Sequence, residues 1–220
     1  RKADGSLAHF PNGSLVCVEN TSNRGGGTCY PQATLDEIAK VAHQNDCATH
    51  LDGARLFNAS VASSTPVARL VRDYDSISIC LSKGLGAPVG SVLVGSSEFI
   101  SKAHRWRKMF GGGMRQAGII AAGGIFALEN HIERMADDHA RAHKLAEHIG
   151  NMDGFDVDIS TVETNMVYIT TNDLASDVIE SLSNKGIDAL DLGSNMLRLV
   201  THLHITDEDI ERTIDAFATM

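Results

Sequence analysis

Residues 75–94 read DSISICLSKGLGAPVGSVLV. The run opens with Asp75–Cys80, whose serines and isoleucines are typical of a buried β-strand. Ser82–Gly90 follows and is too rich in glycine to form a helix. A second apolar segment, Ser91–Val94, predicts another strand. The stretch therefore places one lysine, Lys83, just past the C-terminal end of a predicted strand.

Strands and helices alternate before this stretch as well. Short apolar segments at Ser14–Val18 and Ala48–Leu51 predict two further strands. Between them, Thr34-Leu-Asp-Glu37 has the spacing of a capping box and predicts a helix that runs to about Gln44. Strands that are apolar throughout are typical of a parallel sheet covered by helices on both faces. The pattern predicts an α/β fold with a mostly parallel sheet.

The second half of the chain has a different organisation. Residues 116–149 consist almost entirely of helix formers and predict a nearly uninterrupted helix, long enough to cross between domains. After Gly150 the sequence predicts two strands and two helices, which suit a small α/β domain. These are Asn165–Ile169, Leu174–Asn184, Met196–Val200 and a helix capped by Thr206 with an acidic first turn. We therefore expect the large domain to include residues 1–130 and the small domain residues 131–220.

Composition narrows the classes of function. The 220 residues are 43% hydrophobic and 21% charged, which is ordinary for a globular protein, and the net charge of -9 argues against nucleic acid or an anionic membrane as a partner. The four cysteines form no CxxC pair, so we expect reduced thiols and a cytoplasmic location. Residues 1–6 lack an apolar signal-peptide core. The chain has ten histidines, but we expect none of them to belong to a transition-metal site.

Asp52 and Lys83 both follow predicted strands, and ligands of open α/β sheets bind at the carboxyl ends of the strands. An enzyme that uses pyridoxal 5'-phosphate (PLP) needs a lysine that binds the cofactor as a Schiff base. It also needs a carboxylate that keeps the pyridine nitrogen protonated. The alternative interpretation is a solvated pair of charges beside a tight connection between two strands. The spacing of the residues leaves both interpretations open.

Four motifs in order resemble those of the low-specificity L-threonine aldolase / L-allo-threonine aldolase family. They are HLDGARLFNA from His50, SICLSKGLGAPVGSVLV from Ser78, GGGMRQ from Gly111 and LRLVTHL from Leu197. The resemblance extends over nearly the whole chain. It implies a fold-type I PLP enzyme, a carbon–carbon lyase that cleaves threonine or allo-threonine to glycine and an aldehyde.

The resemblance also implies roles for individual residues. Lys83 would hold the cofactor, Asp52 would pair with the pyridine nitrogen, and Arg55 would lie close to the cofactor hydroxyl. Arg198 would bind the substrate carboxylate, a task that suits a bidentate guanidinium. The alternative for Arg198 is a surface arginine on a strand.

Two further basic residues match family positions near the cofactor phosphate or the active site of a neighbouring subunit. Arg115 follows three glycines that could form an anion-binding turn, so we expect it to contact the cofactor. Lys108 is expected at the substrate, although with Arg105 and Arg107 it could equally form a solvated helix face. The chain departs from the family at Ser22, where a histidine is expected.

The resemblance implies a homo-oligomer, built as a dimer of dimers, that acts on a small amino acid. A second departure from the family is His204, where an aspartate is expected. Family members are longer than this chain, so we expect the first strands of the large sheet and the phosphate-binding loop to lie outside it. The alternatives are another fold-type I PLP enzyme, such as a β-eliminating lyase or an aminotransferase, and an inactive fragment of such an enzyme.

Overall fold

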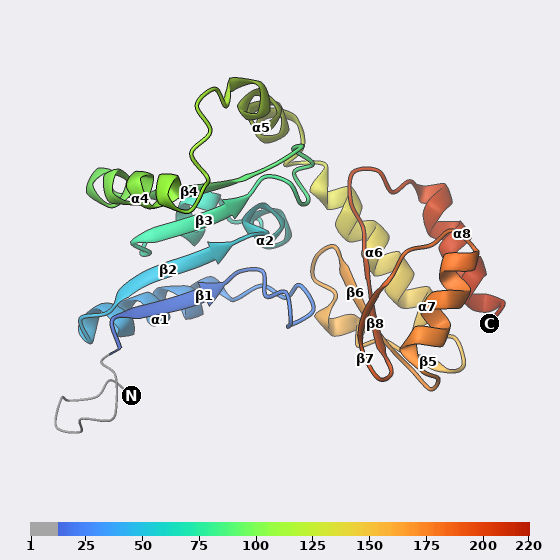
Figure 1. The fold of residues 1–220 in the computed structure, drawn as a ribbon. Helices are drawn as coiled ribbons and strands as arrows, with labels where there is room; N and C mark the ends of the chain where they lie inside the picture. Colours follow the sequence, from blue (N-terminus) through green and yellow to red (C-terminus); the bar gives the residue numbers. More distant parts are fainter. Residues whose placement is uncertain (1–12) are drawn as a thin grey trace.

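A computed structural model describes residues 13–220, which form two four-stranded sheets (Figure 1). The strands of the first sheet lie in the order β1-β2-β3-β4; they are β1 (Leu15–Glu19), β2 (Ala48–Gly53), β3 (Ser76–Cys80) and β4 (Ser91–Gly95). Those of the second lie in the order β5-β6-β8-β7; they are β5 (Phe155–Asp156), β6 (Met166–Thr171), β7 (Leu190–Gly193) and β8 (Met196–Val200). Our expectation for residues 1–6 falls outside the described residues.

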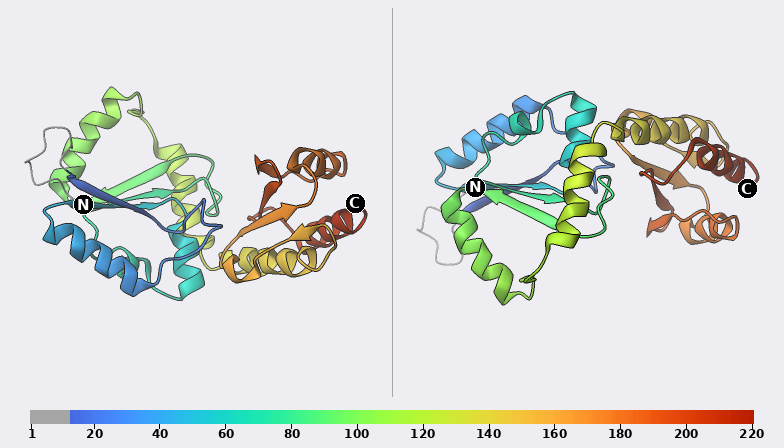
Figure 2. Two further views of the ribbon diagram at one scale, coloured as in Figure 1. Left: turned by 90° about the horizontal axis from the view of Figure 1, so that it is seen from below. Right: turned by 90° about the horizontal axis from the view of Figure 1, so that it is seen from above.

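The first sheet is mostly parallel, as predicted. β1, β2 and β3 run in the same direction, and β4 pairs antiparallel with β3 at one edge. Figure 2 shows α1 (Gln32–Gln44) and α4 (Ser97–Met109) on opposite faces of this sheet. The core under α1, α2 (Leu56–Ser63) and α3 (Val67–Leu70) is built from buried side chains of these helices and the strands; among them are Leu35, Leu51, Leu56, Leu70 and Ile77. This face of the sheet is closed by apolar packing.

One predicted helix start is correct and one is wrong. Thr206 caps α8 (Asp207–Ala218) in a capping box with Asp209, as its sequence indicated. Thr34 does not cap α1, because the helix begins at Gln32 after Pro31, whose carbonyl accepts the Thr34 N–H at 2.9 Å. Thr34 therefore lies inside the first turn and not at the N-cap position, and α1 has no side-chain cap.

The long helix predicted for residues 116–149 is wrong. The chain forms two helices, α5 (Gly118–Asn130) and α6 (Met135–Ile149), separated by a short turn. In that turn the His131 Nδ1 donates a hydrogen bond to the Leu85 carbonyl at 2.7 Å, and Met135 is buried in a cluster with Leu85. Tertiary contacts with the loop that carries Lys83 therefore override a local preference for helix.

The second sheet has its own core. α6, α7 (Ala175–Asn184) and α8 contribute to one buried cluster with the strands, which includes Ile149, Ile169, Leu182, Leu197 and Phe217. α6 packs against both α2 and β6, so it joins the two halves of the fold. The two sheets lie on either side of residue 130, where we predicted the domain boundary. Among the helices of residues 13–220, none combines the length and the apolar character of a membrane span.

Candidate active site

Lys83, in the loop after β3 of the first sheet, and Arg198, on β8 of the second, line the same cavity of about 500 Å³. Arg55 and the loop at residues 82–88 form the wall on the side of the first sheet. The opposite wall is formed by Arg198 and Val200 on β8, by Asn165 just before β6, and by the loop at residues 202–204. The volume lies within the usual range for pockets that bind small molecules. The fold thus brings together two of the residues that the sequence predicted to act on one substrate.

Lys83 lies in a loop that packs closely against α2 on one side and against the loop after β8 on the other. Gly86 has a φ of +69°, and a Cβ there would lie 2.9 Å from the Leu203 side chain, so a larger residue would be strained. A Cβ at Gly84 would lie 3.1 Å from Asn58 on α2. The Lys83 side chain itself is exposed and has no hydrogen-bond or ion-pair partner within residues 13–220. Its amine is therefore free to react.

Asp52 lies at the same edge of the first sheet. It is opposite Glu19 on β1 and Ser78 on β3, close to the carboxyl ends of all three parallel strands. The side chain is half-buried, and its Oδ1 accepts a hydrogen bond from the Ala54 N–H at 3.0 Å, which fixes the carboxylate. Asp52 does not line the cavity that contains Lys83. Its predicted contact with a pyridine nitrogen stays a prediction.

Two arginines give this region a positive field. Burial lowers the pKa of Arg55, and the neighbouring charge of Arg198 lowers it further, while Glu19 acts in the opposite direction. Arg55 follows Asp52 closely in sequence and occupies the N-cap position of α2. Both guanidinium groups border one cavity, which favours an anionic ligand such as a carboxylate.

Arg198 is held by a residue that the sequence did not single out. Its NH1 donates a hydrogen bond at 2.7 Å to the Oδ1 of Asn23, which lies in the loop after β1. Asn165 was also missed: it is buried on the cavity wall and its Nδ2 donates to the Thr201 carbonyl at 2.8 Å. Asn23 closely follows the strand predicted at Ser14–Val18, and this position is the signal that could have identified it.

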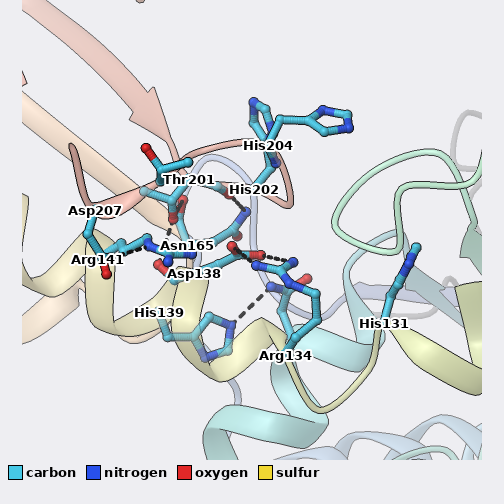
Figure 3. A network of polar contacts seen from close by, with 12 residues as sticks. His131, Arg134, Asp138, His139, Arg141, Asn165, Thr201, His202, His204 and Asp207 are labelled. Carbon is cyan, nitrogen blue, oxygen red and sulfur yellow. Dashed lines mark hydrogen bonds and ion pairs between the residues drawn. The ribbon is translucent and has the colours of Figure 1, made fainter. Parts of the chain in front are cut away.

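A buried polar network supports the wall formed by the second sheet (Figure 3). Asp138 on α6 is fully buried and forms an ion pair with Arg134 one turn away. The Thr201 hydroxyl donates to the Asp138 carbonyl at 2.6 Å, and Thr201 also pairs with Asn165. On the other side of α6, His139 accepts a hydrogen bond from Asn58 at 3.0 Å. The network therefore links α2, α6 and the end of β8 beside the cavity.

Comparisons with known proteins place this fold. The sequence model described as beta-eliminating lyase matches residues 1–172. The chain belongs to this family. The family uses PLP, as the resemblance implied. The structure also superposes on a solved Leishmania major threonine aldolase with a TM-score of 0.79 and 21% identity, which covers 97% of this chain and 63% of that one. The fold is therefore the predicted fold-type I fold of PLP enzymes.

Relatives in the family carry more specific names. The chain is 41% identical to low-specificity L-threonine aldolase 1 of Arabidopsis thaliana, across 94% of this chain and 59% of that protein. It is 40% identical to the low-specificity L-threonine aldolase of Escherichia coli K12, across 92% of this chain and 59% of that protein. The chain thus spans about three fifths of the length of these relatives. The predicted resemblance to threonine aldolases is confirmed.

Lys108 and Arg115 lie away from the cavity that contains Lys83. Both are exposed and border a separate hollow of about 660 Å³ on α4 and the loop after it, together with Arg105 and Arg107. Within residues 13–220 these two family positions therefore do not meet Lys83 or Arg198. Their predicted contacts with cofactor and substrate stay predictions.

The two departures from the family have different settings. Ser22 does not line the cavity; its hydroxyl accepts the Gly25 N–H at 3.2 Å within the turn after β1. His204 does line the cavity and stacks edge to face on His202, with ring centroids 5.7 Å apart. Within residues 13–220 no group of three or more metal-binding side chains is assembled.

Proposed function

We propose that the protein cleaves β-hydroxy-α-amino acids, threonine or allo-threonine, to glycine and an aldehyde with PLP as cofactor. The observation that carries this proposal is the shared cavity, which both Lys83 in the loop after β3 and Arg198 on β8 line. The names of the relatives at about 40% identity support the choice of reaction.

The residues at this edge of the sheet fit the cofactor. Lys83 is exposed to the cavity with an unpaired amine, which covalent attachment to an aldehyde requires. One carboxylate oxygen of Asp52 accepts a hydrogen bond from a backbone N–H, so the other oxygen can accept a hydrogen bond from a protonated nitrogen. When bound, PLP supplies an electron sink that stabilises negative charge on the substrate Cα.

The remaining chemistry depends on orientation. Arg198 would bind the substrate carboxylate at its guanidinium, while Lys83 would release the cofactor to the substrate amine and recover it after cleavage. With both ends of the amino acid fixed, the Cα–Cβ bond can be held in the orientation in which it breaks. Asp52 would keep a proton on the pyridine nitrogen, and Arg55 would contact the cofactor hydroxyl.

Product analysis tests the proposal. The full-length protein with PLP should release acetaldehyde and glycine in equal amounts from allo-threonine or threonine. Lys83→Ala should abolish the release, whereas Lys185→Ala, which changes a lysine distant in sequence that bonds the Ala216 carbonyl, should not. Release of acetaldehyde that is unaffected by Lys83→Ala would contradict the proposal.

A second candidate function is β-elimination, which the description of the matched family favours. The same Asp52, Lys83 and Arg198 would serve that reaction, because fold and cofactor do not fix which bond breaks. The two candidates differ in their products. Release of ammonia and a keto acid in place of glycine and acetaldehyde would select elimination.

We also propose that the protein forms a homo-oligomer, a dimer of dimers. Several large apolar side chains on α4, α5 and the loop between them are exposed; they include Trp106 at 54%, Phe110 at 82% and Ile119 at 91%. Apolar surface of this extent usually marks an interaction surface. Lys108 and Arg115 lie in the same region, which agrees with their expected role at a neighbouring active site. Light scattering of the full-length protein should give the mass of four subunits.

We infer a cytoplasmic location from the cysteines. Cys17, Cys29, Cys47 and Cys80 are all free thiols. Free thiols are typical of a reducing compartment. Localisation of the tagged full-length protein by microscopy or fractionation tests this inference.

A further inference from the structure

We propose that Asn23 is a positioning residue that sets the affinity of Arg198 for the substrate carboxylate. This inference rests on the proposed function, in which Arg198 binds that carboxylate. Asn23 lies 175 residues before Arg198 in the sequence, yet its Oδ1 accepts a hydrogen bond from the Arg198 NH1 at 2.7 Å. Within residues 13–220 the Arg198 guanidinium makes this one hydrogen bond, and its Nε is buried without a partner.

Asn23 is itself fixed at both backbone groups. Its N–H donates to the Glu19 carboxylate at 3.1 Å, and its carbonyl accepts from the Tyr168 hydroxyl at 2.6 Å. Tyr168 on β6 lies directly opposite Arg198 on β8. Tyr168, Asn23 and Arg198 therefore form a closed set of contacts, which leaves the Asn23 amide little freedom to turn away from the guanidinium.

The hydrogen bond between Asn23 and Arg198 fixes the position of Arg198 relative to Lys83. Asn23 follows β1 of the first sheet, whose carboxyl edge also carries Asp52 and leads to the Lys83 loop. Arg198 belongs to the second sheet. A bond between Asn23 and Arg198 therefore sets the distance between the group that binds the substrate carboxylate and the group that binds the cofactor. An error of about 1 Å in such a distance is costly for catalysis.

The chemical type of residue 23 matters as much as its position. An amide oxygen orients a guanidinium without cancelling its charge, so Arg198 keeps a full positive charge for a carboxylate ligand. Arg55 is close enough to repel Arg198, and Glu19 lies close enough to Arg55 to offset its charge. An aspartate at position 23 would hold the guanidinium equally well but would compete with the substrate carboxylate for its charge.

The test compares two ligands on the full-length protein loaded with PLP. Glycine carries a carboxylate, and glycinamide carries a neutral amide in its place. Binding is followed by the change in the visible spectrum of the cofactor. Asn23→Ala should weaken glycine binding about tenfold or more, since a hydrogen bond to a charged group is lost, and should change glycinamide binding less than about twofold. Asn23→Asp should also weaken glycine binding selectively.

Two controls separate positioning from a general effect on folding. Asn151, an exposed asparagine after α6 that bonds the Glu147 carbonyl, should tolerate Ala or Asp with no change for either ligand. On an Arg198→Ala background, Asn23→Ala should have no further effect on glycine binding, because the two residues act through one contact.

Three results would overturn the inference: glycine binding unchanged in Asn23→Ala, equal weakening of glycine and glycinamide, or full recovery of glycine binding in Asn23→Asp. Equal weakening or recovery would show a purely structural role. A wild-type protein whose spectrum does not respond to glycine would contradict the proposed function before any Asn23 variant is compared, and the inference would fail with it.

Discussion

A substitution at Asp52 should affect catalysis without preventing the cofactor from binding. Because Oδ1 is fixed by the Ala54 N–H, Asp52→Asn preserves the shape of the site and removes only its negative charge. We expect this substitution to lower kcat by about a hundredfold or more, because the pyridine nitrogen would lose the group that keeps it protonated. A PLP adduct on Lys83 should still form. Asp153→Asn, in an exposed turn, is the control; an unchanged kcat in Asp52→Asn would contradict the assigned role.

Cys29 gives a prediction that does not depend on catalysis. Burial and the neighbouring Glu163 carboxylate raise the pKa of Cys29 to about 12. The thiol should therefore stay protonated and react slowly with iodoacetamide at about pH 8, since the thiolate is the nucleophile. Glu163→Gln should speed this reaction. Cys17, which is exposed, serves as the internal control by mass spectrometry, and equal rates at both cysteines in the wild type would refute the prediction.

The sequence could mark candidate residues of the site but not their contacts. Asp52 and Lys83 could be singled out because they stand at, or just past, the ends of strands that meet at one edge of the first sheet. Arg198 lies within β8, and only the family resemblance pointed to it. The bond between Asn23 and Arg198 could not, because it joins residues 175 positions apart in two sheets. Lys108 and Arg115 match the family motifs, yet the fold places them in a separate hollow. A motif identifies a residue type, and packing decides what the side chain meets.

The two threonines that the sequence marked as helix caps form a matched pair. Thr206 accepts the Asp209 N–H at 3.2 Å, whereas Thr34 lies inside α1 and caps nothing. We expect Thr206→Ala to lower the free energy of unfolding by about 1 kcal/mol, and Thr34→Ala by no more than a few tenths. Urea denaturation measures both. A larger loss for Thr34→Ala would show that the position of the cap in α1 is wrong.

His139 on α6 should make stability depend on pH. Burial lowers its pKa, with Asp138 acting in the opposite direction, and the neutral ring accepts a hydrogen bond from Asn58. The unfolded chain binds a proton at this residue below about pH 6.5, while the folded chain does so only at lower pH. The free energy of unfolding should therefore decrease as pH falls from about 6.5 toward the folded pKa.

His139→Gln should flatten that part of the stability profile, measured by urea denaturation across the pH range. His148→Gln, on the same helix but exposed, is the control and should leave the slope nearly unchanged. A wild-type profile that His139→Gln does not alter would mean that the proton uptake occurs elsewhere.

Strands and helices were predicted well where the local sequence alone determines the secondary structure. The six predicted strands each match an observed strand to within two residues at either end, because apolar segments between turn residues have few alternatives. The helix at residues 116–149 was wrong, since helix propensity cannot report the contacts of His131 and Met135 with Leu85. The break separates α5 from α6, the helix that joins the two halves.

At the scale of the whole molecule, the cavity depends on both sheets. The loop after β3 of the first sheet carries Lys83, and β8 of the second carries Arg198. α6, which carries a buried ion pair, packs against α2 and β6 and so contacts both halves. The chain spans about three fifths of its relatives' length, so the activity of the whole protein is a proposal that the full-length protein must test.

The most direct test of the central claim is to incubate the full-length protein with PLP, reduce it with borohydride and locate the adduct by mass spectrometry. We predict a visible absorbance band that borohydride removes, with a single reduced PLP adduct on Lys83 and none on Lys108. An adduct on another lysine, or no adduct on the full-length protein, would contradict the assignment of Lys83 as the residue that holds the cofactor.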